Sequence, residues 1–429
     1  MADLQINSES VFNFEQCLKC SVCTVYCPVS AVNPAYPGPK QAGPDGERYR
    51  LKNPVFFDEN LKKCLNCKRC EVACPQNVNV GDIIQVARMK YSNHKPGLRD
   101  RILASTDFVG TMANRFAPIV NKTLALDITK SLMHSTIGVD KHRQFPAYSA
   151  QRFETWYKRN AKAQQAQYSK QVSYFHGCYV NYNFPKLGKD LVKIMNAVGY
   201  GVQLLDKEKC CGVAKIANGL YDQAKKHGNI NINSIRKAKE EGRVTLGTSS
   251  TCCFTIRDEY EHVLGMESAD MRESMTLATR FLYQLLDEGK IKLAFRSDYK
   301  KRVAYHSACH MERMGWVFYS TELLKMIPGV DFTMLDSQCC GIAGTYGFKR
   351  ENYETSQTIG SGLFKQIKEV APDCVATDCE TCKWQIEMST GVPVENPISI
   401  IADALDVEAT IKLNSYLINF VIQRGRHRA

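Results

Sequence analysis

Two cysteine runs near the N-terminus constrain this chain more than any other feature. Each has the spacing Cys-x-x-Cys-x-x-Cys-x-x-x-Cys-Pro, and they span Cys17–Pro28 and Cys64–Pro75. This is the ligand spacing of proteins that carry paired [4Fe–4S] clusters, in which three thiolates of a run hold one cluster and the fourth ligates the other. The sequence therefore predicts two clusters, one on Cys17, Cys20, Cys23 and Cys74, and the other on Cys64, Cys67, Cys70 and Cys27.

Structural zinc is the alternative occupant of such runs. Zinc sites take four ligands, usually as two spaced pairs, and a doubled four-cysteine run fits that pattern poorly. Pro28 and Pro75 lack an N–H and end the local turn after each fourth cysteine. The runs favour iron–sulfur clusters over zinc.

The size of the chain excludes a disulfide scaffold as the reason for its 19 cysteines. A chain of 429 residues can bury a large core in two to four domains. Cysteines in metal-ligand spacings indicate a reducing, cytoplasmic compartment. We expect no signal peptide and no membrane span, because residues 1–15 are polar and no segment approaches ~20 apolar residues.

The net charge of +12 favours an acidic partner or an anionic membrane surface, so we expect a soluble or peripheral protein. Without a recognition motif, we expect no nucleic-acid partner.

Turn residues dominate the segment between the two runs. Asn33 to Gly46 is rich in Pro and Gly, which predicts a long loop without a helix, either a docking loop or a plain insertion. After the second run, the apolar spacing from Val80 to Arg88 predicts a short amphipathic helix.

An amphipathic pattern without cysteines follows from Leu98 to about Tyr168. Apolar residues recur every three or four positions, which predicts two short helices separated near Pro118. We expect them to pack on the next domain. A membrane-facing or quinone-lining surface is the alternative. The periodic apolar residues are Phe108, Met112, Phe116, Ile119, Val120 and Leu124.

The remainder of the chain is a tandem repeat built on Cys-Cys-Gly motifs. The first copy has Cys178, Cys210-Cys211-Gly212 and Cys252, and the second has Cys309, Cys339-Cys340-Gly341, Cys379 and Cys382. Predicted strands at 172–175, 202–205 and 244–248 alternate with predicted helices at 187–198 and 223–240. This alternation indicates α/β domains with largely parallel sheets, which bind ligands at the carboxyl ends of their strands.

The two copies differ in their candidate ligands. The second offers five thiolates, Cys309, Cys339, Cys340, Cys379 and Cys382, one more than a cubane needs, which favours an unusual multi-iron cluster. In the first, Ser249 aligns with Cys379, and a serine hydroxyl is a poorer iron ligand than a thiolate. The first copy is therefore expected to hold a cubane, a zinc ion or nothing on Cys178, Cys210, Cys211 and Cys252.

Other residues near these motifs have less distinctive roles. Cys253 and Cys374 match no repeat position and are predicted to be buried structural thiols. We expect His176, His306 and His310 to be structural histidines with satisfied rings. Proton handling near a quinone is the alternative.

Residues 406–429 form the predicted tail of the chain. One face carries Leu413, Tyr416, Leu417, Phe420 and Val421, and the end is basic. This pattern suits a helix on a membrane surface or a helix that docks on a partner subunit.

The fold class expected from these features is α+β multidomain. The predicted parts are an α-helical two-[4Fe–4S] ferredoxin domain at 1–95, a helical connector at 96–168, two α/β Cys-Cys-Gly domains at 169–297 and 298–405, and the tail.

Two ferredoxin runs followed by two Cys-Cys-Gly repeats resemble the iron–sulfur subunits related to heterodisulfide reductase. Residues 12–405 are most similar to members of that family that serve anaerobic glycerol-3-phosphate dehydrogenases. The similarity is clearest in Tyr36–Arg48, Phe175–Tyr182, Leu335–Phe348 and Thr377–Met388.

This resemblance implies a peripheral electron-transfer subunit at the cytoplasmic face of the inner membrane. Its implied partners are the flavin-containing catalytic subunits A and B as electron donors and menaquinone as the acceptor. The chain has no glycine fingerprint for a dinucleotide, consistent with a flavin on another chain. Two alternatives are a subunit for glycolate or lactate oxidation and a disulfide reductase with chemistry at the Cys-Cys-Gly cluster.

The crossed ligand assignment predicts the effect of Cys27→Ser. This variant should damage the cluster on Cys64, Cys67 and Cys70, because Cys27 is the fourth ligand of that cluster. Electron paramagnetic resonance and Mössbauer spectra of anaerobically purified protein would measure the loss. Loss of only the Cys17–Cys20–Cys23 cluster would contradict the crossing.

Overall fold

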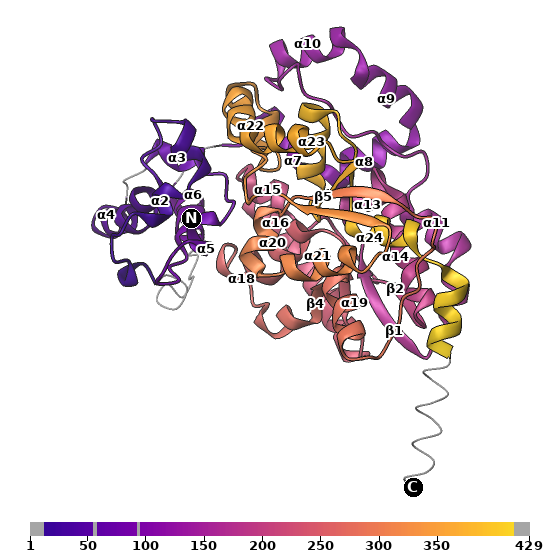
Figure 1. Cartoon of the computed structure of the whole chain (residues 1–429). Helices are drawn as coiled ribbons and strands as arrows, with labels where there is room; N and C mark the ends of the chain where they lie inside the picture. The colour runs from indigo at the N-terminus through magenta and orange to yellow at the C-terminus, as the bar shows by residue number, and fades with distance from the viewer. Residues whose placement is uncertain (1–12, 55–57, 92–94, 416–429) are drawn as a thin grey trace.

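The computed structural model describes residues 13–54, 58–91 and 95–415. Figure 1 shows a small N-terminal helical lobe beside a larger α/β body. The described part of the lobe is built from short helices and contains no strand. Its helices are α2 (Val22–Val25), α3 (Pro28–Val32), α4 (Gly46–Lys52), α5 (Arg69–Val72) and α6 (Val80–Tyr91), with turns η1 (Phe14–Gln16), η2 (Gln41–Asp45) and η3 (Glu59–Lys63).

The two cysteine runs share an unusual backbone conformation. Lys19 and Ser21 in the first run, and Asn66 and Lys68 in the second, have φ between 57° and 63°. Non-glycine residues seldom adopt this left-handed conformation. It occurs here at the same positions of both runs, on either side of the second cysteine, so the chain curls the same way in each.

The segment from Asn33 to Gly46 differs from its prediction as a loop without a helix. Gln41–Asp45 form the π-helical turn η2, which leads directly into α4. Pro44 cannot donate a backbone hydrogen bond. Within this segment the buried Arg50 side chain donates from Nη2 to the carbonyls of Ala42 (3.0 Å) and Gly43 (3.2 Å).

Six helices lie between the lobe and the first sheet, and the first four are α7 (Leu98–Ala104), α8 (Thr106–Arg115), α9 (Ala117–Ala125) and α10 (Asp127–Thr136). Pro118 lies in the first turn of α9, so the predicted break is confirmed. The expectation that the apolar face packs on the next domain is wrong for Phe108, Met112, Phe116 and Ile119, which we call the apolar stripe. These side chains are 46–71% exposed.

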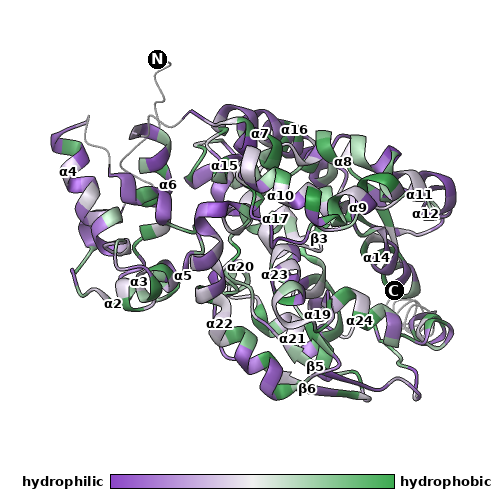
Figure 2. Cartoon of the chain, turned by 90° about the horizontal axis from the view of Figure 1, so that it is seen from above, coloured by the Kyte–Doolittle hydropathy of each residue, from purple (hydrophilic) through white to green (hydrophobic). Residues whose placement is uncertain are grey.

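The helices α9 and α10 arch away from the body in Figure 1, and Figure 2 shows apolar residues (green) along α8 and α9. Ala117 is the only buried residue of α9, and α10 has none. Next come α11 (Phe153–Asn160) and α12 (Lys162–Gln165).

Two four-stranded sheets of the same topology form the body. Their orders are β2-β1-β3-β4 and β6-β5-β7-β8, and every pairing is parallel, as predicted. The strands are β1 (Lys170–Phe175), β2 (Tyr200–Leu204), β3 (Thr245–Gly247), β4 (Met275–Leu277), β5 (Lys301–Tyr305), β6 (Val330–Met334), β7 (Cys374–Ala376) and β8 (Val394–Glu395).

Helices between the strands cover the sheets. In the first half they include α13 (Gly177–Tyr182), α14 (Pro185–Ala197), α15 (Val213–Ala217), α16 (Tyr221–Glu240), α17 (Ser250–Phe254), α18 (Tyr260–His262) and α19 (Ala278–Asp287). In the second half they include α20 (Cys309–Met314), α21 (Val317–Lys325), α22 (Tyr353–Val370), α23 (Glu380–Thr390) and α24 (Pro397–Ala404).

The two halves of the body share their hydrophobic cores, which contain residues from both sheets. Cys253 and Cys374 are fully buried in these cores, as predicted. After α24, residues 407–415 are helical, and the rest of the predicted tail lies outside the described residues. In the part of the chain that the structure describes, no helix is long and apolar enough to span a bilayer.

A buried group of charges joins the N-terminal lobe to both halves of the body. Lys68 forms ion pairs with Asp82 and with Glu71 (3.7 Å). Arg313 of α20 donates from Nε to Glu71 Oε2 (2.7 Å), and His262 of α18 lies 3.2 Å from Asp82. Burial opposes the charged form of Lys68, but the carboxylates of Asp82 and Glu71 raise its pKa. We call these five side chains the junction cluster.

The junction cluster predicts the effect of Arg313→Ala. Removing one partner of a buried ion pair costs ~3 kcal/mol, because the other charge stays buried. Burial and the Asp82 carboxylate raise the pKa of Glu71, so acidification should protonate it and reduce the loss. Anaerobic unfolding followed by cluster absorbance at several pH values would measure both effects.

The matched control is Lys365→Ala, which removes an exposed ion pair to Glu369 (3.7 Å). Such surface pairs contribute little to stability. Equal destabilisation by the two variants would contradict the role of the junction cluster.

Candidate metal centres

The thiols of the N-terminal lobe form two groups, and neither group matches one run. Cys17, Cys20, Cys23 and Cys74 line one small cavity. Burial raises the pKa of Cys27, and the nearby Cys64 thiolate adds to this effect. The pKa of Tyr36 is raised by burial and by charge on the second group, Cys64, Cys27, Cys70 and Cys67. The fourth cysteine of each run therefore lies with the first three of the other.

The cysteines of the body lie where strands end and helices begin. Cys178 and Cys309 open α13 and α20, just after β1 and β5, while Cys252 and Cys382 lie in the first turns of α17 and α23. This is the predicted edge of the sheets.

The doublets turn sharply at Gly212 (φ 90°) and Gly341 (φ 85°). A Cβ at Gly341 would lie 2.0 Å from the Ser356 carbonyl oxygen, so no other residue fits the second turn.

Both cysteine sets of the body line a single cavity of about 320 Å³. Cys67 of the N-terminal lobe lines it too, so thiols from all three regions meet there. Every cysteine of the chain is free of disulfides. Sequence spacing had predicted each set but not their meeting. The thiols on the cavity wall are Cys67, Cys178, Cys210, Cys211, Cys252, Cys309, Cys339, Cys340, Cys379 and Cys382.

The second-copy thiols are close enough to share a centre. The Sγ–Sγ distances are 3.9 Å for Cys309–Cys339 and 3.4 Å for Cys340–Cys382. A hydrogen bond with Cys382 lowers the pKa of Cys379 to about 7, against the effect of burial. A lower pKa favours the thiolate, which is the form that binds metal.

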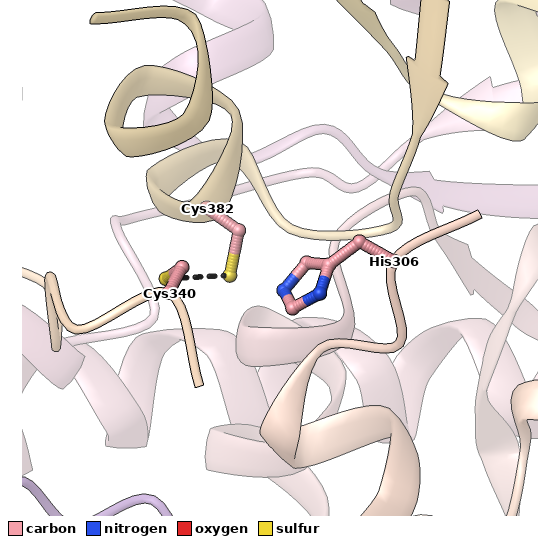
Figure 3. A group of neighbouring side chains, drawn as sticks. All are labelled: His306, Cys340 and Cys382. Carbon is pink, nitrogen blue, oxygen red and sulfur yellow. Dashed lines mark hydrogen bonds between the residues drawn. The ribbon is translucent and has the colours of Figure 1, made fainter. Parts of the chain in front are cut away.

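His306 departs from the expectation of a satisfied histidine. Figure 3 shows its ring beside Cys340 and Cys382, and a ligand atom from each of the three lies within 4.8 Å of the others. Neither ring nitrogen has a hydrogen-bond partner among the described residues. His176 and His310 do have partners, since His176 Nδ1 lies 3.0 Å from the Gly177 oxygen and His310 Nε2 lies 3.3 Å from the Asn66 oxygen.

The first-copy set keeps four thiols, Cys178, Cys210, Cys211 and Cys252. Ser249 is the N-cap of α17 and Cys379 is the N-cap of α23, so the two residues occupy equivalent places. The Ser249 hydroxyl donates to Glu380 Oε2 (2.7 Å), so it is already engaged. Burial and the neighbouring Cys379 raise the pKa of Glu380 to about 8.

The cavity connects the centres in space. Thr251 Oγ1 of the first copy lies 3.7 Å from Cys379 Sγ of the second. A hydrogen bond with Cys309 raises the pKa of Cys67, which places the N-terminal thiols against the second-copy set.

Thiolate donors select iron–sulfur clusters, zinc or cuprous copper. The described residues therefore fit iron–sulfur centres, and they supply an additional unpartnered imidazole at the second one.

Comparison with known proteins identifies the same parts. Residues 172–257 and 303–387 match the cysteine-rich domain, and residues 13–78 match the 4Fe-4S dicluster domain. Lactate utilization protein A of Oceanobacillus iheyensis is 31% identical over 46% of this chain and 80% of its own length. The B subunit of fumarate reductase (CoM/CoB) of Methanothermobacter marburgensis is 28% identical over 51% of this chain and 42% of its own length.

The similarity to one further protein covers nearly the whole chain. The C subunit of anaerobic glycerol-3-phosphate dehydrogenase of Escherichia coli (strain K12) is 57% identical over 394 residues, 92% of this chain and 99% of that protein. An identity this high over nearly the whole of both chains exceeds what shared domains alone would give. The chain therefore belongs to the family of the C subunit of anaerobic glycerol-3-phosphate dehydrogenase.

Proposed function

We propose that the chain is the electron-transfer subunit of an anaerobic glycerol-3-phosphate dehydrogenase. In this role it accepts electrons from flavin-containing subunits A and B and passes them to menaquinone at the cytoplasmic face of the membrane. The observation that carries the proposal is a series of thiol groups in space. It begins with the group around Cys17 in the N-terminal lobe and ends with the first-copy set, which includes Cys252, on the wall of the shared cavity. We infer the substrate, glycerol 3-phosphate, from the family to which the chain belongs.

The order of the thiol groups suggests the route. Electrons would enter at the two N-terminal cubanes and leave the second through Cys67, beside Cys309. The five-thiolate centre would follow, with the four-thiol set of the first copy adjoining it. The reduction potential of an iron–sulfur centre depends on its solvent exposure and on hydrogen bonds to its sulfurs. Burial of the thiols therefore gives the protein control over the potentials along the route.

Lactate oxidation is the second candidate, because lactate utilization protein A of Oceanobacillus iheyensis is 31% identical to this chain over 207 residues. That relative covers only 46% of this chain, compared with 92% for the glycerol-3-phosphate relative. Anaerobic co-purification of the chain with its natural partners, followed by identification of those chains, distinguishes the two.

The route predicts that Cys379→Ser, which makes the second copy resemble the first, stops electron delivery. In the assembled complex we expect at least a tenfold loss of menaquinone reduction, because a serine hydroxyl stays protonated and binds iron poorly. Reduction of an artificial dye by the flavin subunits should remain. The rates of menaquinone reduction and of dye reduction would be measured on the same preparation and compared between the variant and the wild-type protein.

Cys374→Ala is the matched control, since Cys374 is fully buried in β7 away from the cavity wall. It should keep both activities. Normal menaquinone reduction by Cys379→Ser would contradict the route through the second copy.

The apolar stripe supports a peripheral contact with the membrane. Phe108, Met112, Phe116 and Ile119 are exposed, and Arg115 and Lys122 are exposed cations on the same two helices. Apolar residues with flanking cations suit the lipid interface. Aromatic and aliphatic groups would enter the acyl boundary, and the cations would meet anionic headgroups.

The contact predicts that the double variant Phe116→Ser with Ile119→Ser binds anionic liposomes about tenfold more weakly or worse. Each substitution removes the free energy gained when an apolar side chain moves from water into lipid. Flotation of the purified chain at rising salt would measure the binding, which should also weaken as salt screens the charges. Phe318→Ser, at a 52% exposed residue of α21, is the control. Unchanged binding in the double variant, with loss on deletion of residues 406–429, would place the anchor in the tail.

A further inference from the structure

His306 is a buried histidine that the proposed electron relay does not use. It directly follows β5, and its backbone N–H donates to the Ala376 carbonyl of β7 (2.9 Å). This bond fixes the residue at the carboxyl edge of the second sheet, where the cysteines of that copy gather. The side chain is 1% exposed, so its ring is held among protein atoms and away from solvent.

Neither buried ring nitrogen has the distance and angles of a hydrogen bond to any described residue. The ring is nevertheless close enough to Cys340 to help lower the pKa of that thiol. A buried polar atom without a partner costs free energy, and native structures contain few of them. Each such atom calls for an explanation, and ligation of a metal or cluster is one that fits this position.

The surroundings of the ring indicate what would satisfy it. A nitrogen of His306 and the sulfurs of Cys340 and Cys382 all lie within 4.8 Å of one another (Figure 3). Cys340 and Cys382 are 3.4 Å apart. Two thiolates about 2.3 Å from one tetrahedral metal lie roughly 3.8 Å apart, so this pair is spaced like ligands of a single metal atom. The imidazole stands beside the pair as a third donor.

The first copy lacks this imidazole. Counting back three residues from the first cysteine of each copy gives His306 before Cys309 and Phe175 before Cys178. Phe175 is also buried, at 1% exposed. The position therefore accepts an apolar ring of similar size, and packing alone does not require histidine there.

We propose that His306 is an iron ligand of the second-copy centre, through one ring nitrogen beside Cys340 and Cys382. This inference rests on the proposed function, which places an iron–sulfur centre on the second-copy thiolates. The centre would then have mixed sulfur and nitrogen ligation, and the first copy would have sulfur alone. Imidazole is a suitable ligand for iron, and histidine ligation is one way in which proteins change the potential of an iron–sulfur centre.

The test is pulsed electron paramagnetic resonance on the full chain, purified anaerobically with unlabelled or ¹⁵N-labelled histidine. We expect a strong histidine-nitrogen coupling to the second-copy centre, which changes from the ¹⁴N to the ¹⁵N pattern on labelling. It should vanish in His306→Phe, which copies the first-copy residue. It should persist in His310→Gln, since His310 lies one residue from Cys309 but stacks on Phe254 (4.5 Å between ring centroids).

Each outcome has a defined meaning. No strong coupling in the wild-type protein overturns the ligation, and so does a coupling that survives in His306→Phe. A weak coupling alone, as from an N–H donated to a cluster sulfur, also overturns it. The labelled wild-type protein and His310→Gln decide the matter if His306→Phe loses its centre. Iron analysis separates the two proposals, because a second copy without iron removes the proposed function, whereas an iron-loaded centre without histidine coupling removes only this inference.

Discussion

The fold depends on the junction cluster, which fixes the N-terminal lobe against both halves of the body. Lys68 lies at its centre and adopts the left-handed conformation between two cysteines of the second run. Burying charges is costly unless each one is paired. The lobe and the body complete each other's pairs, since Arg313 and His262 supply partners for Glu71 and Asp82. A lobe docked in this way holds Cys67 on the wall of the shared cavity.

The two halves of the body show how one fold can carry two different donor sets. Their strand orders are identical, and Ser249 and Cys379 both cap the helix that follows the third strand. The differences fall on single positions at the carboxyl edges of the sheets. Serine replaces cysteine in the first copy, and phenylalanine replaces histidine three residues before the first cysteine. Because the two halves share one backbone topology, each substitution changes the ligands without changing the scaffold.

Local patterns predicted β1, β2 and β3, the parallel sheets and the grouping of thiols within each motif, because spacing of a few residues determines each of them. The meeting of Cys67 with Cys309 was not predictable in this way, since the two residues are far apart in the chain and the contact depends on how the lobe docks. Periodicity identified the apolar face of α8 and α9 but not its exposure, because an amphipathic pattern does not say what covers the face. The π-helical turn at Gln41 was not predicted either, and it accepts a hydrogen bond from Arg50, whose side chain returns to the turn from the next helix.

The ionisation of the thiols on the wall of the shared cavity links metal binding to the stability of the body. In two of the close thiol pairs, Cys340–Cys382 and Cys178–Cys210, the pKa of one partner is lowered and the pKa of the other is raised. Hydrogen bonds with Cys339 and Cys382 lower the pKa of Cys340, whereas those with Cys340 and Cys379 raise the pKa of Cys382. The same opposition holds in the first copy, where Cys178 and Cys211 lower the pKa of Cys210 and Cys210 raises that of Cys178. Protein groups alone therefore do not favour ionising all the thiols together. Metal binding requires thiolates, so a metal bound in either set would supply the stabilising positive charge, and its binding free energy would add to the stability of the folded chain.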